Sequence, residues 1–283
     1  MSTTADHLID RHDAVDSRSS SEPTPPLPPS AQRSKCPTHR SAARGLILET
    51  ILVTIGTVAV VSVLHARGAS GPQWILIPSV LVAAALVPAW IGKREFPCVG
   101  LHRDHAWAIL KTVGGVSACI LPAVFLGLWV LTSLLKLPLP LPPILPAEQS
   151  WFTWVIYQFF YVAVAEEVFF RGYIQANTMK LLEHCGWTRN CGFRVANCRW
   201  KEAIGANPQS TVGNPQSIVA ILVSAACFAA SHVVVQGQIV SVLTFLPGLV
   251  LAWLFIRTRS LLAPILFHGL ANISYGFVAL MLT

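Results

Sequence analysis

The chain has 283 residues, of which 53% are hydrophobic and only 12% are charged, and its mean hydropathy is +0.58. This composition is typical of integral membrane proteins and argues against an ordinary soluble domain. The formal net charge of +7 comes with no basic patch interleaved with aromatic residues, so we do not expect a nucleic-acid partner. We predict an all-α, polytopic membrane helix bundle of about seven to eight transmembrane helices.

The N-terminal segment differs from the rest of the chain. Residues 1–43 are rich in Ser, Pro and Thr, and they include the run PTPPLPPS at 23–30. Such a segment has too few apolar residues to pack, so we predict a disordered cytoplasmic tail. The first apolar run begins only near Leu46, which favours a signal-anchor span over a cleaved signal peptide.

Seven apolar windows in the remainder have the length needed to cross a bilayer. A helix needs roughly 20 residues to cross a hydrocarbon core of about 30 Å. The windows lie at 46–64, 74–91, 113–135, 152–171, 218–235, 239–256 and 261–282. The first three belong to an N-terminal part, 44–150, and the last four to a C-terminal part, 151–283.

The basic residues are divided unequally between the two sides of these spans. Sixteen Lys and Arg residues flank one side, whereas only Arg67 and Lys136 flank the other. The positive-inside rule therefore predicts a cytoplasmic N-terminus and, with seven spans, a C-terminus on the opposite side. We expect the plasma (inner) membrane as the location.

A long polar loop at 183–217 separates the fourth and fifth spans. Residues 173–182 can extend the fourth helix as an amphipathic segment, whereas the loop itself contains Gly, Asn, Pro and Ser. Three of the seven cysteines, Cys185, Cys191 and Cys198, lie in the loop at a spacing that matches no zinc site. We expect reduced thiols and no disulfide framework.

The fourth span ends with two acidic residues and an arginine. Ionisable side chains inside a bilayer are costly, so they are functional-site candidates by default. Glu167 and Arg171 are four residues apart and can pair on one helix face. Glu166 points about 100° away from Glu167, which leaves it free to act as a general base. The alternative is an interfacial Glu–Arg clamp at a helix end.

Two further spans carry polar side chains at helical spacing. In the fifth span Phe228 and His232 share a face, and in the seventh span His268 and Asn272 share a face. A lone histidine such as His232 is more often a packing residue than a catalyst. His268 and Asn272 predict either an interhelical hydrogen-bond staple or a pair of donors for an oxyanion.

The three fragments together resemble a known family. The order Glu-Glu-x-x-x-Arg, Phe-x-x-x-His and His-x-x-x-Asn on three late spans resembles the CPBP or ABI family of intramembrane glutamic proteases, which includes the type II CAAX prenyl endopeptidases. The run Phe170-Arg171-Gly172 and the run 257–265 before His268 support it, and the resemblance covers about 152–275. Residues 151–283 are then the catalytic part. The loop at 183–217 is longer than expected for the family, so the resemblance does not assign the route by which a substrate reaches the site.

The resemblance implies peptide-bond hydrolysis without a metal, another cofactor or a covalent intermediate. By similarity, Glu166 and His232 activate a water, and His268 and Asn272 stabilise the oxyanion, while Glu167 and Arg171 organise the site. The implied partners are the lipid bilayer and a membrane-anchored peptide or protein, and the sequence does not choose between a prenylated C-terminal peptide and another membrane-anchored substrate.

Other readings of the same residues remain open. Glu and His side chains also suit a divalent metal, and the scaffold can serve a non-catalytic membrane protein for bacteriocin immunity or protein binding. A transporter is disfavoured because no internal repeat is visible. A zinc protease of the H-E-x-x-H type is excluded because the motif is absent, and Gly68-Ala69-Ser70-Gly71 is interpreted as a turn, not as a rhomboid serine motif.

Overall fold

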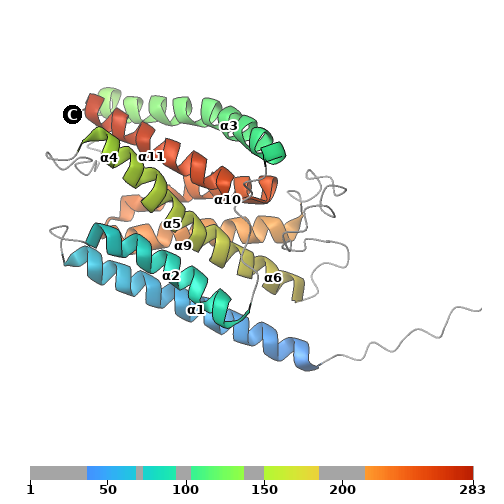
Figure 1. Ribbon diagram of the computed structural model, residues 1–283. Coiled ribbons are helices and arrows are strands. Elements are labelled where there is room, and N and C mark those ends of the chain that lie inside the picture. The colour runs from blue at the N-terminus through green and yellow to red at the C-terminus, as the bar shows by residue number, and fades with distance from the viewer. Residues whose placement is uncertain (1–36, 68–72, 94–102, 137–149, 185–213, 283) are drawn as a thin grey trace, which may run out of the picture. The chain divides into compact units, whose positions relative to one another are not determined.

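Each of the seven predicted spans corresponds to helical structure. The computed structural model describes residues 37–67, 73–93, 103–136, 150–184 and 214–282, which belong to one unit of the chain, Pro37–Thr283 (Figure 1). Within these residues, the helices outside the fourth span are α1 (Pro37–Ala66), α2 (Gln73–Ile91), α3 (Arg103–Trp129) with η1 (Val130–Leu134), α9 (Pro215–Gln236), η4 (Ile239–Thr244), α10 (Phe245–Thr258) and α11 (Leu262–Leu282). The described residues contain no β-strand, so the all-α prediction is confirmed.

The fourth span is part of a single long helical rod, which we call the α4–α6 rod. It comprises α4 (Trp151–Ile156), η2 (Tyr157–Ala163), α5 (Val164–Glu167), η3 (Val168–Gln175) and α6 (Ala176–His184). The junction residues keep right-handed helical dihedrals, so the rod is not interrupted. The segments η2 and η3 are π-helical, a geometry that is frequent at functional sites. Because the rod continues past Arg171, Glu166 lies near its middle.

Several helices have the length and composition of membrane spans. Four qualify outright, namely Ala43–Ala66, Ala106–Leu134, Pro215–Gln236 and Ile239–Thr258, and the shorter apolar helices Ile75–Ile91 and Leu262–Val278 accompany them. Large apolar side chains such as Ile55 and Leu126 are exposed on these helices, as expected for surfaces that face lipid. The protein is a helical bundle and an integral membrane protein.

The α4–α6 rod lies between two helix pairs. In Figure 1 the pair α1–α2 and the pair α3–α11 lie on opposite sides of the rod, with α11 contacting η2 and α2 contacting η3. The helix α9 packs against η3, α6, α1 and α10. The middle of the rod is thus enclosed by helices from both ends of the sequence.

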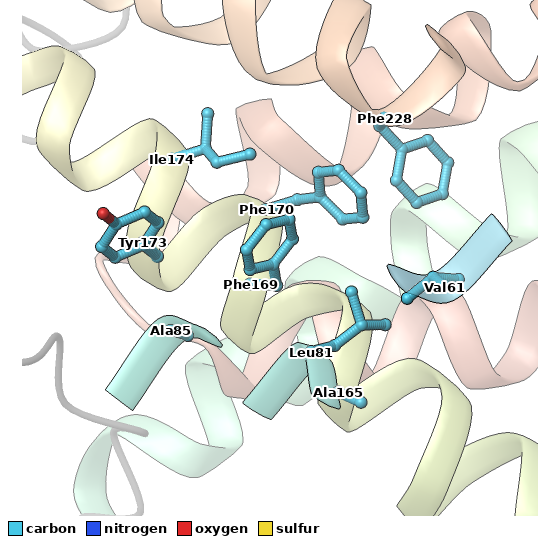
Figure 2. Close-up of a cluster of buried hydrophobic side chains, with 9 residues drawn as sticks. All are labelled: Val61, Leu81, Ala85, Ala165, Phe169, Phe170, Tyr173, Ile174 and Phe228. Atoms are coloured by element: carbon cyan, nitrogen blue, oxygen red, sulfur yellow. The ribbon is translucent and has the colours of Figure 1, made fainter. Parts of the chain in front are cut away.

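A cluster of buried apolar side chains joins α1 and α2 to the rod. Figure 2 shows Phe169 and Phe170 of the rod among residues from α1, α2 and α9, and the complete cluster consists of Val61, Leu81, Ala85, Ala165, Phe169, Phe170, Tyr173, Ile174 and Phe228. The rings of Phe170 and Phe228 meet edge to face, with centroids 5.1 Å apart. The small side chains of Ala85 and Ala165 are fully or almost fully buried, which allows α2 to approach the rod closely.

Polar contacts also connect α1 to the rod. The Tyr173 hydroxyl donates to Glu49 Oε1 at 3.1 Å, and Asn177 Nδ2 donates to Thr50 Oγ1 at 3.4 Å. Glu49 is an ionisable residue inside the first span that the sequence analysis did not single out. Its carboxylate therefore has a partner on the rod, which fixes α1 against the segment just after Arg171.

Some predictions concern segments outside the described residues. These are most of the N-terminal tail, the Gly68–Gly71 turn, and the 185–213 part of the polar loop with Cys185, Cys191 and Cys198. The orientation of the chain across the membrane also stays a prediction. Within the described residues Cys119 and Cys227 are free thiols.

Candidate active site

The two adjacent glutamates of α5 have different environments. Glu167 is fully buried, and its Oε2 accepts a hydrogen bond from Arg171 Nε at 3.0 Å. This is the i,i+4 pair expected from the spacing. The side chain of Glu166 keeps 18% of its surface exposed, and its buried Oε2 has no hydrogen-bond partner among the described residues. The helical period therefore separates one braced carboxylate from one available carboxylate.

Arg171 is held by two groups besides Glu167, the Ser224 hydroxyl and the Phe228 ring. Its Nη1 donates to Ser224 Oγ at 2.7 Å, and that hydroxyl donates in turn to the Phe170 carbonyl at 3.1 Å. The guanidinium carbon lies 5.2 Å from the centre of the Phe228 ring, a cation–π geometry. Ser224 was not predicted, although it lies on the same α9 face as Phe228 and His232, at intervals of four residues.

Glu167 also binds His268, which the sequence analysis did not foresee. His268 Nδ1 lies 2.8 Å from Glu167 Oε1. An ionised carboxylate only accepts hydrogen bonds, so Nδ1 carries the proton and Nε2 is left facing Glu166, with Nε2 3.7 Å from Oε2. A continuous chain of buried polar contacts thus runs through Ser224, Arg171, Glu167 and His268.

His232 approaches Glu166 from α9. Its Nδ1 lies 2.9 Å from the Phe228 carbonyl, so Nδ1 must donate because a carbonyl oxygen only accepts. The other ring nitrogen, Nε2, faces Glu166 Oε2 at 4.0 Å. The Nε2 atoms of both histidines therefore converge on one carboxylate oxygen, at separations longer than a direct hydrogen bond.

The Phe228 ring lies at the centre of this arrangement. Its centroid is 4.4 Å from the His232 ring and 5.9 Å from the His268 ring, which it meets edge to face. Gly248 of α10 lies against it, because a Cβ at Gly248 would be 3.3 Å from Phe228 Cδ1. Phe228 thereby contacts both imidazole rings and the Arg171 guanidinium.

Asn272 follows His268 by one turn of α11 but has a different partner. Its Nδ2 donates to Gln158 Oε1 of η2 at 3.0 Å. Asn272 thus lies beside the rod at a level eight residues before Glu166 in sequence. Gln158 was not predicted, and its sequence signal is an amide in the mostly apolar first half of the fourth span.

No metal-like cluster is visible in the described residues. Within them, no three His, Cys, Asp or Glu side chains have the spacing of a metal site.

Comparison with known proteins assigns the region that contains these residues. Residues 148–274 match the model of a family described as type II CAAX prenyl endopeptidase Rce1-like. After this match we call residues 148–274 the Rce1-like region. It contains Glu166, Glu167, Arg171, His232, His268 and Asn272, whereas α1, α2 and α3 lie outside it. No curated protein and no solved structure matches the chain.

The family assignment confirms the resemblance inferred from the three motifs. It indicates a membrane protease of the CAAX type, that is, a peptide hydrolase. The helices α1 and α2 pack against the Rce1-like region near Phe169. Both helices lie outside the residues that the family model matches.

Proposed function

We propose that the protein is an intramembrane glutamic endopeptidase that cleaves a membrane-associated peptide or protein without a metal. The observation that carries the proposal is the convergence of His232 Nε2 and His268 Nε2 on Glu166 Oε2, at 4.0 and 3.7 Å. These groups lie in the Rce1-like region, within helices of an apolar bundle.

The partners of the two histidines favour different roles. His232 donates Nδ1–H to a neutral carbonyl, so its Nε2 carries a lone pair that can accept a proton or a hydrogen bond from water. His268 donates Nδ1–H to a carboxylate, and the negative charge of Glu167 compensates an imidazolium. A doubly protonated His268 can direct Nε2–H at an oxyanion. His232 thus supports the base, and His268 supports the oxyanion.

The reaction then proceeds through one water molecule. Water hydrogen-bonded to Glu166 Oε2 and His232 Nε2 loses a proton to Glu166 as its oxygen attacks the scissile carbonyl carbon. His268 and Asn272 stabilise the oxyanion that forms. When the C–N bond breaks, Glu166 returns the proton to the departing amine, so that the carboxylate is restored.

The substrate is membrane-associated because the site lies within the helical bundle. The family name favours a prenylated C-terminal peptide, and another membrane-anchored peptide is the alternative. We further propose that the protein resides in the plasma (inner) membrane with a cytoplasmic N-terminus, on the basis of the asymmetric distribution of Lys and Arg.

The proposal is tested with purified protein in liposomes and a panel of membrane-tethered peptides, with and without a prenyl group. Wild type is compared with Glu166→Ala and His268→Ala, and cleavage is detected by mass spectrometry. We expect cleavage by the wild type only, and the same rate after chelation of divalent metals. Equal cleavage by all three proteins would reject the assignment, and activity that is lost to a chelator and restored by zinc would establish a metal mechanism instead.

A further inference from the structure

We propose that Gln158 is a positioning residue that fixes the side chain of Asn272 in the oxyanion site. The inference rests on the proposed function, because it concerns how that function is prepared. The direct observation is the 3.0 Å hydrogen bond from Asn272 Nδ2 to Gln158 Oε1, which joins α11 to η2. Gln158 occupies neither of the Glu-Glu-x-x-x-Arg and His-x-x-x-Asn motifs.

Two glycines of α11 determine the distance across which this bond forms. Gly269 and Gly276 lie three residues before and four residues after Asn272, so all three share one helix face. A Cβ at Gly269 would be 2.6 Å from Phe159 Cδ1, and a Cβ at Gly276 would overlap the ring of Trp154. The two helices can therefore approach this closely only because both side chains are absent.

The opposite side of this contact is built from large, packed rings. Trp154 is buried and meets the Trp151 ring edge to face, with centroids 5.4 Å apart. Trp151 stacks in turn on Phe277 of α11 at 4.9 Å. We call the facing residues Trp154, Gln158, Phe159, Gly269, Asn272 and Gly276 the glycine seam. The Trp151 ring, which stacks on Phe277, packs against Trp154 and restricts its movement.

The glycine seam gives the Asn272 amide a defined orientation. An asparagine amide has two N–H donors, and Gln158 Oε1 takes one of them. The orientation of the second donor is thereby fixed relative to α11. A donor that is already oriented stabilises an oxyanion better than one that must be ordered during the reaction. Gln158 therefore acts on catalysis through Asn272 without touching the substrate.

The first experiment compares the effect of Gln158→Leu in the wild type with its effect in an Asn272→Ala background. Gln158→Leu keeps the side-chain size but removes the acceptor, and we expect kcat to fall about tenfold or more while KM changes less than about twofold. In an Asn272→Ala background, Gln158→Leu should cause no further loss. Independent, multiplicative losses would overturn the inference, because they would mean that Gln158 acts on its own. Unchanged kcat with a lower melting temperature would also overturn it.

A second variant tests the seam from the α11 side. Gly276→Ala adds a Cβ against Trp154, two residues beyond the region matched by the family. We expect the same loss of kcat as for Gln158→Leu and no addition of the two effects. The matched control is Gly115→Ala, because a Cβ at Gly115 meets no atom within 4 Å. Full activity of Gly276→Ala, with its fold intact, would contradict the seam.

A readout without catalysis separates this inference from the proposed function. Thermal unfolding in detergent is measured for Gln158→Leu, Asn272→Ala and the double variant. We expect the decrease in melting temperature of the double variant to be smaller than the sum of the two single decreases. Each single variant already loses the Asn272–Gln158 hydrogen bond, so the second substitution cannot remove it again. If the wild type cleaves no peptide but the coupling is present, the proposed function fails and the seam stands; additive shifts would overturn the seam itself.

Discussion

Glu166 and Glu167 are adjacent in sequence, yet their side chains have opposite relations to the surrounding protein. Glu167 is fully buried and saturates both oxygens with Arg171 and His268. Glu166 is partly exposed and faces two imidazole nitrogens beyond hydrogen-bond distance. Removing one member of a buried ion pair such as Glu167–Arg171 strongly destabilises the fold. Glu166 has no such partner, so we expect its substitution to leave the packing intact. Two substitutions separate these roles.

Glu166→Gln should abolish turnover and leave the fold intact. The amide keeps the shape of the side chain but cannot take a proton from water, so we expect activity to fall about a hundredfold or more. Cleavage of a tethered peptide is the measurement, and the size-exclusion profile of the purified protein is the control for folding. Retention of wild-type turnover would contradict the role of Glu166 as the base.

Arg171→Ala should instead reduce the amount of folded protein. The substitution leaves Glu167 buried without its cation, and the loss is typically about 3 to 5 kcal/mol for a fully buried pair. We expect a lower melting temperature and a lower yield of monodisperse protein. Arg44→Ala on α1 is the control, because that arginine is exposed and its removal should leave the melting temperature unchanged. Normal yield with full activity would show that Arg171 is not needed to stabilise the buried Glu167 carboxylate.

At the scale of elements, the site depends on how closely α10 packs against α9, the helix that carries Phe228 and His232. Gly248 brings α10 against α9, because a Cβ there would be 3.3 Å from Phe228 and 3.4 Å from Ala225. Phe228 in turn contacts both histidine rings and the Arg171 guanidinium. We therefore expect a small displacement of α10 to reach the two imidazoles through the Phe228 ring.

Gly248→Ala should lower both stability and activity. The added methyl overpacks the contact with Phe228, at a cost of about 1 to 3 kcal/mol. We expect a reduced melting temperature and a lower kcat as His232 is displaced from Glu166. The control is Gly127→Ala on α3, where a Cβ meets no atom within 4 Å. Equal behaviour of the two variants would show that the position of Phe228 is not critical.

At the scale of the whole molecule, helices outside the Rce1-like region help to enclose the site. The helices α1 and α2 contribute Val61, Leu81 and Ala85 to the cluster around the Glu-bearing part of the rod. Glu49 of α1 also accepts the Tyr173 hydroxyl hydrogen bond. The helices α1 and α2, which lie outside the family match, are thus structural components of the bundle.

The predicted topology of the molecule is testable directly. Seven spans with the basic residues on one side place the two chain ends on opposite sides of the membrane, the N-terminus inside. In sealed right-side-out vesicles, a protease added from the outside should remove a C-terminal tag and spare an N-terminal tag. Removal of both tags would require an even number of spans and would revise the orientation.

Features that depend on neighbouring residues were predictable from the sequence. Apolar windows of bilayer length predicted the helices, and the i,i+4 spacing predicted that Glu167 pairs with Arg171. The order of the three motifs identified the family that the comparison confirms. The period of a helix fixes such relations locally, so they require no knowledge of how the helices pack.

Only the tertiary structure decided which side chains meet between helices. Glu167 and His268 are 101 residues apart in the sequence, Asn272 and Gln158 are 114 apart, and Ser224 and Arg171 are 53 apart. Spacing within one helix gives the face on which a residue lies but neither the rotation nor the depth of the helix opposite. Those are set by packing, above all by the glycines that let α11 lie against the rod.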